Sequence, residues 1–125
     1  MKLINYIVLC TKIHYILYKW SKLSKIELKI DKEKQNLSLY KKIFIKDEED
    51  LKLNKLFIEG YELKINLLNK KYLSLSNSIK YSLLKNNIFN WEKFLFNCYK
   101  ANISSELVNK VKEIYIHYFK VLESI

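Results

Sequence analysis

The chain has 125 residues, half of them hydrophobic, with one Gly and no Pro, which predicts one domain over 1–125 and excludes collagen-like, linker-like and intrinsically disordered chains. Its net charge of +10 comes entirely from Lys, and Lys, Leu, Ile, Asn and Tyr fill 81 of the 125 positions, a bias that A/T-rich codons impose. Since phosphate binding favours the planar fork of Arg, the charge argues only weakly for a nucleic acid partner.

The first 20 residues predict an amphipathic helix with a wide apolar face. Apolar side chains recur at steps of three and four residues from Ile4 to Trp20. Lys12, His14 and Lys19 interrupt this run, which argues against a signal sequence or a membrane span. No other run approaches spanning length, so we expect a soluble, cytoplasmic protein.

Residues 21–50 are polar and rich in Lys, and we expect a long connection with some local order there. The acidic run at 47–50 then marks the start of a second helix. Gly60 could end this helix, or it could lie inside a longer helix at a cost of about 1 kcal/mol relative to Ala. In the first case Leu63, Ile65 and Leu67 alternate as in a strand. The leading fold class is all-α, and the alternative is α+β with a small sheet around 26–67 flanked by helices.

Three further helices are expected in the last 50 residues. Ser76 or Asn77 can cap a short helix that stops near the Asn86-Asn87 pair. The next helix begins near Asn90 and is apolar almost all round, which is typical of a helix buried on every side. The last helix begins at Ser104 or Ser105 and has the clearest amphipathic period.

No set of residues in the sequence predicts catalysis. His14 and His117 are far apart, with no Cys or carboxylate at metal-ligand spacing, and a single Gly excludes glycine-rich phosphate loops. Cys10 and Cys98 lie in apolar stretches and are expected to be reduced core thiols. We therefore expect no enzyme, no metal and no cofactor.

The helix around Trp91 carries a resemblance to Bcl-2-like regulators of apoptosis. The first homology motif of that family reads Asn-Trp-Gly-Arg, and here Asn90-Trp91-Glu92-Lys93 occupies its place. The third homology motif is a Leu, three residues, then Gly and Asp followed by an acidic and a hydrophobic residue, and the segment 56–63 fits it with Tyr61 in place of Asp. The helix ending at Trp20 resembles the fourth motif.

The resemblance implies a bundle around a buried central aromatic helix, with a hydrophobic groove formed by its second to fifth helices. Such a groove accepts the amphipathic death-motif (BH3) helix of a pro-apoptotic partner, and Lys93 would meet an Asp of that ligand. The second homology motif and the hydrophobic tail anchor of the family are not found before Ile125. The groove lining that the resemblance implies is Leu63 and Leu67 on the second helix, Ile79 and Leu83 on the fourth, and Trp91, Lys93 and Phe94 on the fifth.

The leading function is thus inhibition of apoptosis by a small, divergent, viral-type member of the family. It would bind pro-apoptotic Bcl-2 proteins of a host cell and reach mitochondria only through its partners. One alternative is a groove-less Bcl-2-like homodimer that inhibits innate signalling. Another is a basic RNA-binding or ribosomal protein of an A/T-rich organelle, in which Lys70 and Lys71 contact phosphates and Tyr side chains stack on bases.

Overall fold

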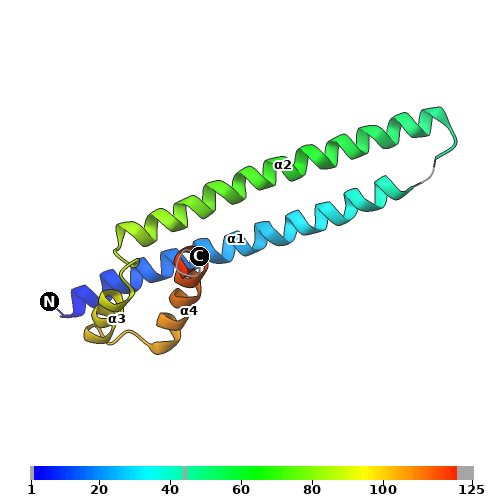
Figure 1. Ribbon diagram of the computed structural model, residues 1–125. Helices are drawn as coiled ribbons and strands as arrows, with labels where there is room; N and C mark the ends of the chain where they lie inside the picture. Colours follow the sequence, from blue (N-terminus) through cyan, green and yellow to red (C-terminus); the bar gives the residue numbers. More distant parts are fainter. Residues whose placement is uncertain (1, 44, 121–125) are drawn as a thin grey trace. The chain divides into compact units, whose positions relative to one another are not determined.

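The computed structural model describes residues 2–43 and 45–120, and its regular structure in these ranges is entirely helical (Figure 1). The all-α prediction is therefore confirmed, and the alternative with a sheet around 26–67 is wrong. The elements are α1 (Lys2–Lys42), α2 (Glu48–Lys85), α3 (Trp91–Lys100), α4 (Ser105–Tyr115) and a π-helical turn, η1 (Ile116–Lys120).

The chain forms two compact units. The terminal unit comprises Met1–Lys22 and Ser76–Ile125, and the hairpin unit comprises Leu23–Leu75. Both long helices contribute to each unit, because α1 continues past Lys22 and α2 continues past Leu75. The two long helices therefore run through both units, whereas α3 and α4 belong to the terminal unit alone.

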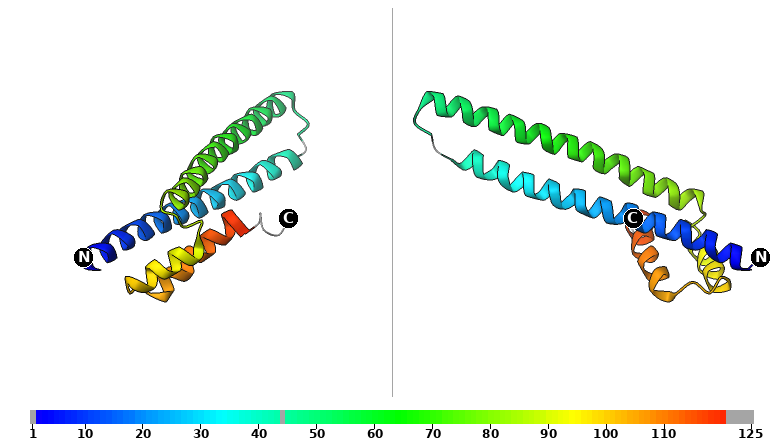
Figure 2. Two further views of the ribbon diagram at one scale, coloured as in Figure 1. Left: turned by 60° about the vertical axis from the view of Figure 1, so that its left-hand side comes forward. Right: turned by 180° about the vertical axis from the view of Figure 1, so that it is seen from behind.

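The hairpin unit consists of two antiparallel helices packed against each other. Tyr40 of α1 stacks on Phe57 of α2, and Glu33 of α1 forms an ion pair with Lys64 of α2, so the two helices run in opposite directions. Within this unit they lie side by side (Figure 2). Apart from Asn36, the partly or fully buried residues of the two helices in this unit alternate at steps of three and four, the heptad spacing of a coiled-coil seam. The seam consists of Leu23, Ile26, Ile30, Glu33, Leu37 and Tyr40 on α1, and of Asn54, Ile58, Tyr61, Ile65, Leu68, Tyr72 and Leu75 on α2.

The expected connection at 21–50 is wrong, because α1 continues to Lys42. The segment 21–42 contains no Gly or Pro that would stop a helix, and its Lys side chains lie outside the seam. Ile26 and Ile30 fit a strand as well as a helix because a spacing of four residues belongs to both periods, but Leu28 between them is exposed. In a strand, Leu28 would share the buried face with Ile26 and Ile30, so its exposure fits the helical period and not the strand period.

Gly60 lies inside α2, so the prediction that it is part of a longer helix is correct. The alternative, in which Gly60 ends the helix and residues 63–67 form a strand, is wrong. The expected separate helix at Ser76 is also part of α2. This helix ends at Lys85, beside the predicted Asn pair, where Asn87 has a φ of 58°. Asn tolerates this left-handed conformation better than most residues, which explains the stop.

The terminal unit adds α3 and α4 to the ends of the long helices. Asn90 and Ser104 cap these two helices, since their side chains accept hydrogen bonds from the backbone N–H groups of Lys93 and Leu107. Both predicted starts are therefore confirmed. The fully buried side chains of this unit are Ile13, Ile16, Ile79, Leu83, Ile88, Cys98, Val111 and Ile114.

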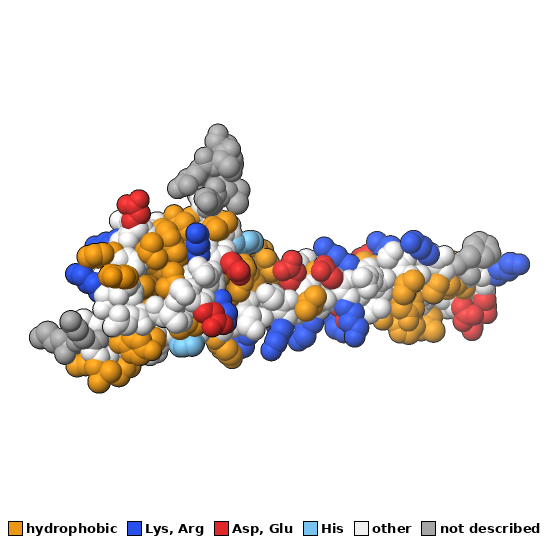
Figure 3. Space-filling model, turned by 90° about the horizontal axis from the view of Figure 1, so that it is seen from below, with side chains coloured by type: hydrophobic (Ala, Val, Ile, Leu, Met, Phe, Trp, Pro, Cys, Tyr) orange, Lys and Arg blue, Asp and Glu red, His pale blue; other side chains and the backbone are white. Residues whose placement is uncertain are grey.

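The prediction that α3 is buried on every side is wrong. Only Phe94 and Cys98, one turn apart, are buried, whereas Phe96 is 56% exposed and Tyr99 is 82% exposed. The other elements of the unit cover one face of this ten-residue helix, so its remaining apolar side chains reach the surface. Hydrophobic side chains are at the surface of both units on the face drawn in Figure 3.

None of the described helices has a stretch both long enough and apolar enough to span a bilayer.

Candidate functional site

The seven residues predicted to line a groove have different environments in the structure. Ile79, Leu83 and Phe94 are in the core of the terminal unit, with 0%, 0% and 3% of their surface exposed. Trp91 is half-buried and Lys93 is exposed in the same unit. Leu63 and Leu67 are exposed in the hairpin unit. The structure thus brings five of the seven into one unit, but three of these five already pack against their own chain.

The assignment of Leu63 and Leu67 to one helix and of Ile79 and Leu83 to another is wrong. All four lie on the continuous helix α2. The helix boundaries expected between them need a stop signal, and the segment 61–78 contains neither Gly nor Pro.

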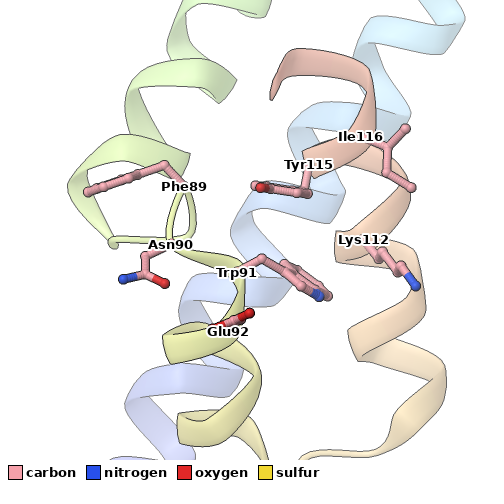
Figure 4. A pocket seen from close by; sticks show the side chains of 7 residues that line it. All are labelled: Phe89, Asn90, Trp91, Glu92, Lys112, Tyr115 and Ile116. Atoms are coloured by element: carbon pink, nitrogen blue, oxygen red, sulfur yellow. The ribbon is translucent and has the colours of Figure 1, made fainter. Parts of the chain in front are cut away.

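The terminal unit contains a pocket of about 650 Å³ beside Trp91, which we call the aromatic pocket (Figure 4). It lies where the turn after α2 leads into α3, opposite the end of α4 and the start of η1. Its lining residues are Phe89, Asn90, Trp91, Glu92, Lys112, Tyr115 and Ile116.

Stacked rings form the apolar wall of the aromatic pocket. The rings of Trp91 and Tyr115 lie 5.2 Å apart at an angle of 28°. The ring centres of Phe94 and Trp91 are 5.3 Å apart, and those of Phe119 and Tyr115 are 5.5 Å apart. Since Phe94 is in the core, the row of four rings joins the pocket wall to the packed interior, and this contact restricts the Trp91 ring.

Three polar side chains lie at the rim of this pocket. Asn90 is held by its capping bond to the N–H of Lys93, at 3.3 Å. Glu92 is in the first turn of α3, where the helix dipole favours its negative charge, and Lys112 is in the last turn of α4, where a positive charge is favoured. The pocket can therefore offer a flat apolar wall and one charge of each sign.

Sequence reasoning found Trp91 but missed the lining residues that come from α4 and η1. Lys112, Tyr115 and Ile116 share one face because they are three and four residues apart in the chain. The buried face of the last helix runs through Val108, Val111 and Ile114. Tyr115 and Ile116 are large apolar residues outside that buried face, and this was the sequence signal for a second apolar surface.

The described His and Cys residues are not among the residues that line the aromatic pocket. His14 lines a shallow hollow beside α4, and His117 packs against the ring of Trp20 at 5.1 Å. Both Cys residues are free; Cys98 is buried as predicted, while Cys10 is only partly buried. Burial, with a smaller electrostatic contribution from Cys10, raises the pKa of Cys98 to about 11, so this thiol stays protonated at neutral pH. Within the described part of the chain, no group of three or more His, Cys, Asp or Glu residues is placed to hold a metal ion.

Comparisons with protein-family models, with curated proteins and with solved structures found no match to this chain. The likeness to Bcl-2-like regulators therefore depends on the short motifs before Trp20, around Gly60 and around Trp91 alone.

Proposed function

We propose that this protein is a non-catalytic binding protein that captures an amphipathic helix of another protein at the aromatic pocket. The observation that carries the proposal is the pocket itself, an open hollow with a stacked Trp91–Tyr115 wall beside the half-exposed ring of Phe89. Its volume of about 650 Å³ is within the range of known ligand sites. Exposed aromatic side chains of this kind anchor many protein interfaces.

The chemistry of the pocket favours a particular ligand. One or two large apolar side chains, spaced by one helical turn, would fill the hollow against Trp91 and Phe89. A carboxylate on the next turn of the ligand would pair with Lys112, whereas a second carboxylate near Glu92 would be repelled. The expected ligand is therefore an apolar helix with an acidic residue on one side only.

The resemblance to Bcl-2-like regulators supplies the first class of ligand to test. Death-motif helices combine apolar anchors with an Asp, so they match the pocket in kind. Binding of such helices would sequester pro-apoptotic proteins and block cell death, which is the physiological role we propose. In this arrangement Lys112, rather than Lys93, is the residue that meets the acidic group.

The test is a titration of the full chain with fluorescent death-motif peptides. We expect dissociation constants of about 1 μM or lower, and a loss of at least about tenfold in Phe89→Glu and Lys112→Glu. The matched control is Phe96→Glu, which changes an equally exposed ring of the same unit outside the pocket and should alter the affinity less than about twofold. Leu83→Glu and Phe94→Glu are unsuitable, because a charge at these core positions would unfold the protein.

A parallel titration with generic RNA separates this proposal from a nucleic-acid function. Phosphate binding weakens by about three powers of ten or more between low and moderate salt when six or more phosphates are contacted, whereas an apolar helix should bind almost equally well at both. No peptide binding together with salt-sensitive RNA binding would overturn the proposal. Peptide binding that Lys112→Glu and Phe89→Glu leave intact would place the ligand elsewhere on the protein.

A further inference from the structure

The outer face of α2 in the hairpin unit carries a second apolar stripe. It consists of Leu53, Leu56, Gly60, Leu63 and Leu67, and we call it the outer stripe. Its steps of three, four, three and four residues match those of the coiled-coil seam. Leu53, Gly60 and Leu67 each precede a seam residue by one position, which turns them about 100° away from α1. The four leucines are 53%, 63%, 61% and 52% exposed.

Such a stripe has the pattern of a helix–helix interface. A heptad-spaced row of Leu packs knobs into holes against a second helix, and burying each Leu side chain is favourable. Solvated faces of helices usually carry charged and polar residues at these positions. The outer stripe therefore indicates a helical partner in addition to α1.

Gly60, the only Gly in the chain, lies at the centre of the outer stripe. A Cβ atom added there would meet no atom within 4 Å, so packing within this chain does not require a Gly. In a helix interior Gly is less favourable than Ala by about 1 kcal/mol. The missing side chain leaves the backbone of α2 open to a close approach by another helix.

The outer stripe is nearly symmetric about Gly60. Leu53 and Leu67 are each seven residues from it, whereas Leu56 is four residues before it and Leu63 is three residues after it. Glu49 and Lys71, both exposed, continue the stripe at its two ends and are also equidistant from Gly60. A two-fold axis at Gly60 would place Leu53 against Leu67 and Glu49 against Lys71 of an antiparallel copy, and Leu56 within one residue of Leu63.

The charge of this segment also suits a second copy. The part of α2 from Glu48 to Leu75 contains five acidic residues and five Lys, so it is neutral although the whole chain carries +10. Three of its five acidic residues lie in the first turn, and Lys70 and Lys71 lie near the other end. An antiparallel pair brings opposite charges together, whereas a parallel pair would bring like charges together.

We propose that two copies of this chain associate through the outer stripe, antiparallel and with the two-fold axis at Gly60. This isologous contact uses the same patch on both copies and closes as a dimer. It involves only the hairpin unit, so it is independent of ligand binding at the aromatic pocket in the terminal unit.

Sedimentation equilibrium of the full chain tests whether the dimer forms. The mass should rise from 15.2 kDa toward twice that value as the protein concentration increases. Leu56→Glu with Leu63→Glu should leave the protein monomeric, and Gly60→Leu should weaken association at least about tenfold while helix content is kept. The control is Leu28→Glu, which changes an equally exposed Leu on α1 of the same unit and should leave the dimer intact.

A charge exchange tests the arrangement of the two copies. Glu49→Lys and Lys71→Glu should each weaken the dimer, most strongly at low salt, and the double variant should restore it. A chain that stays monomeric at about 200 μM, or a dimer that the Leu56 and Leu63 substitutions leave intact, would overturn the proposal. A double variant no better than the single ones would rule out the two-fold axis at Gly60.

Discussion

Lys19 is a charged residue buried in the terminal unit. It is 8% exposed, and its Nζ donates hydrogen bonds to Ser78 Oγ at 2.7 Å and Ser82 Oγ at 3.2 Å. The same nitrogen lies 4.1 Å from the centre of the Tyr15 ring. Among the described residues Lys19 forms no ion pair, so hydroxyl oxygens and an aromatic face offset the cost of burying its charge.

Removing one of these hydroxyls should therefore be costly. We expect Ser78→Ala to lower the free energy of unfolding by about 1–3 kcal/mol, because it takes an acceptor from a buried charge. Lys19→Met in the same background should recover most of that loss, since the charge that needed the acceptor is gone. Denaturant unfolding of the single and double variants measures both effects, with the exposed Ser74→Ala as control. Strictly additive losses would show that Lys19 does not depend on Ser78.

At the level of the element, the short helices depend on their caps and the long helices on their seam. In α4, Ser104 Oγ accepts from the N–H of Leu107 at 3.3 Å, which supplies a partner for one of the free N–H groups of the first turn. A helix of 11 residues is marginal by itself, so its cap and its buried face must act together.

Ser104→Ala should lower the free energy of unfolding by about 1 kcal/mol. The adjacent Ser105→Ala is the matched control: it is inside the helix, where Ala is the best helix former, and should change stability by less than about 0.5 kcal/mol. Thermal unfolding followed by circular dichroism distinguishes the two. An equal effect at both positions would mean that the cap does not stabilise α4.

At the scale of the whole molecule, stability depends on which of many apolar side chains the tertiary structure covers. Leu83 and Leu84 are neighbours on α2, yet Leu83 is fully buried in the terminal unit and Leu84 is 43% exposed. Burial of this kind, repeated over Ile13, Ile79 and Ile114, makes up the core of that unit.

This difference predicts unequal costs for the same substitution. Leu83→Ala should lower the free energy of unfolding by about 2–5 kcal/mol, because it leaves a cavity in a packed core. Leu84→Ala should cost about 0.5 kcal/mol or less. Equilibrium unfolding in urea measures both, and similar losses at the two positions would contradict the burial pattern described here.

The sequence by itself determined the features that depend on neighbouring residues. The left-handed Asn87, the caps at Asn90 and Ser104 and the acidic first turn of α2 all act within one helical turn, so their effects can be predicted from local chemistry. The sequence also favoured the all-α class, and in residues 2–43 and 45–120 the short alternations at 26–30 and 63–67 indeed lie inside long helices.

Only the tertiary structure decided which faces are covered. Phe94 and Phe96 are chemically identical and two residues apart, but one is in the core and the other is at the surface, because the covering side chains come from distant parts of the chain. For the same reason the sequence did not reveal the length of α1, because the seam with α2 stabilises its polar segment as a helix. Nor did it reveal the aromatic pocket, because part of the lining comes from α4 and η1, which are distant in the chain from Trp91. The hydrophobic period of a sequence shows which residues share a face of a helix. Whether these residues are buried depends on the element that packs against that face.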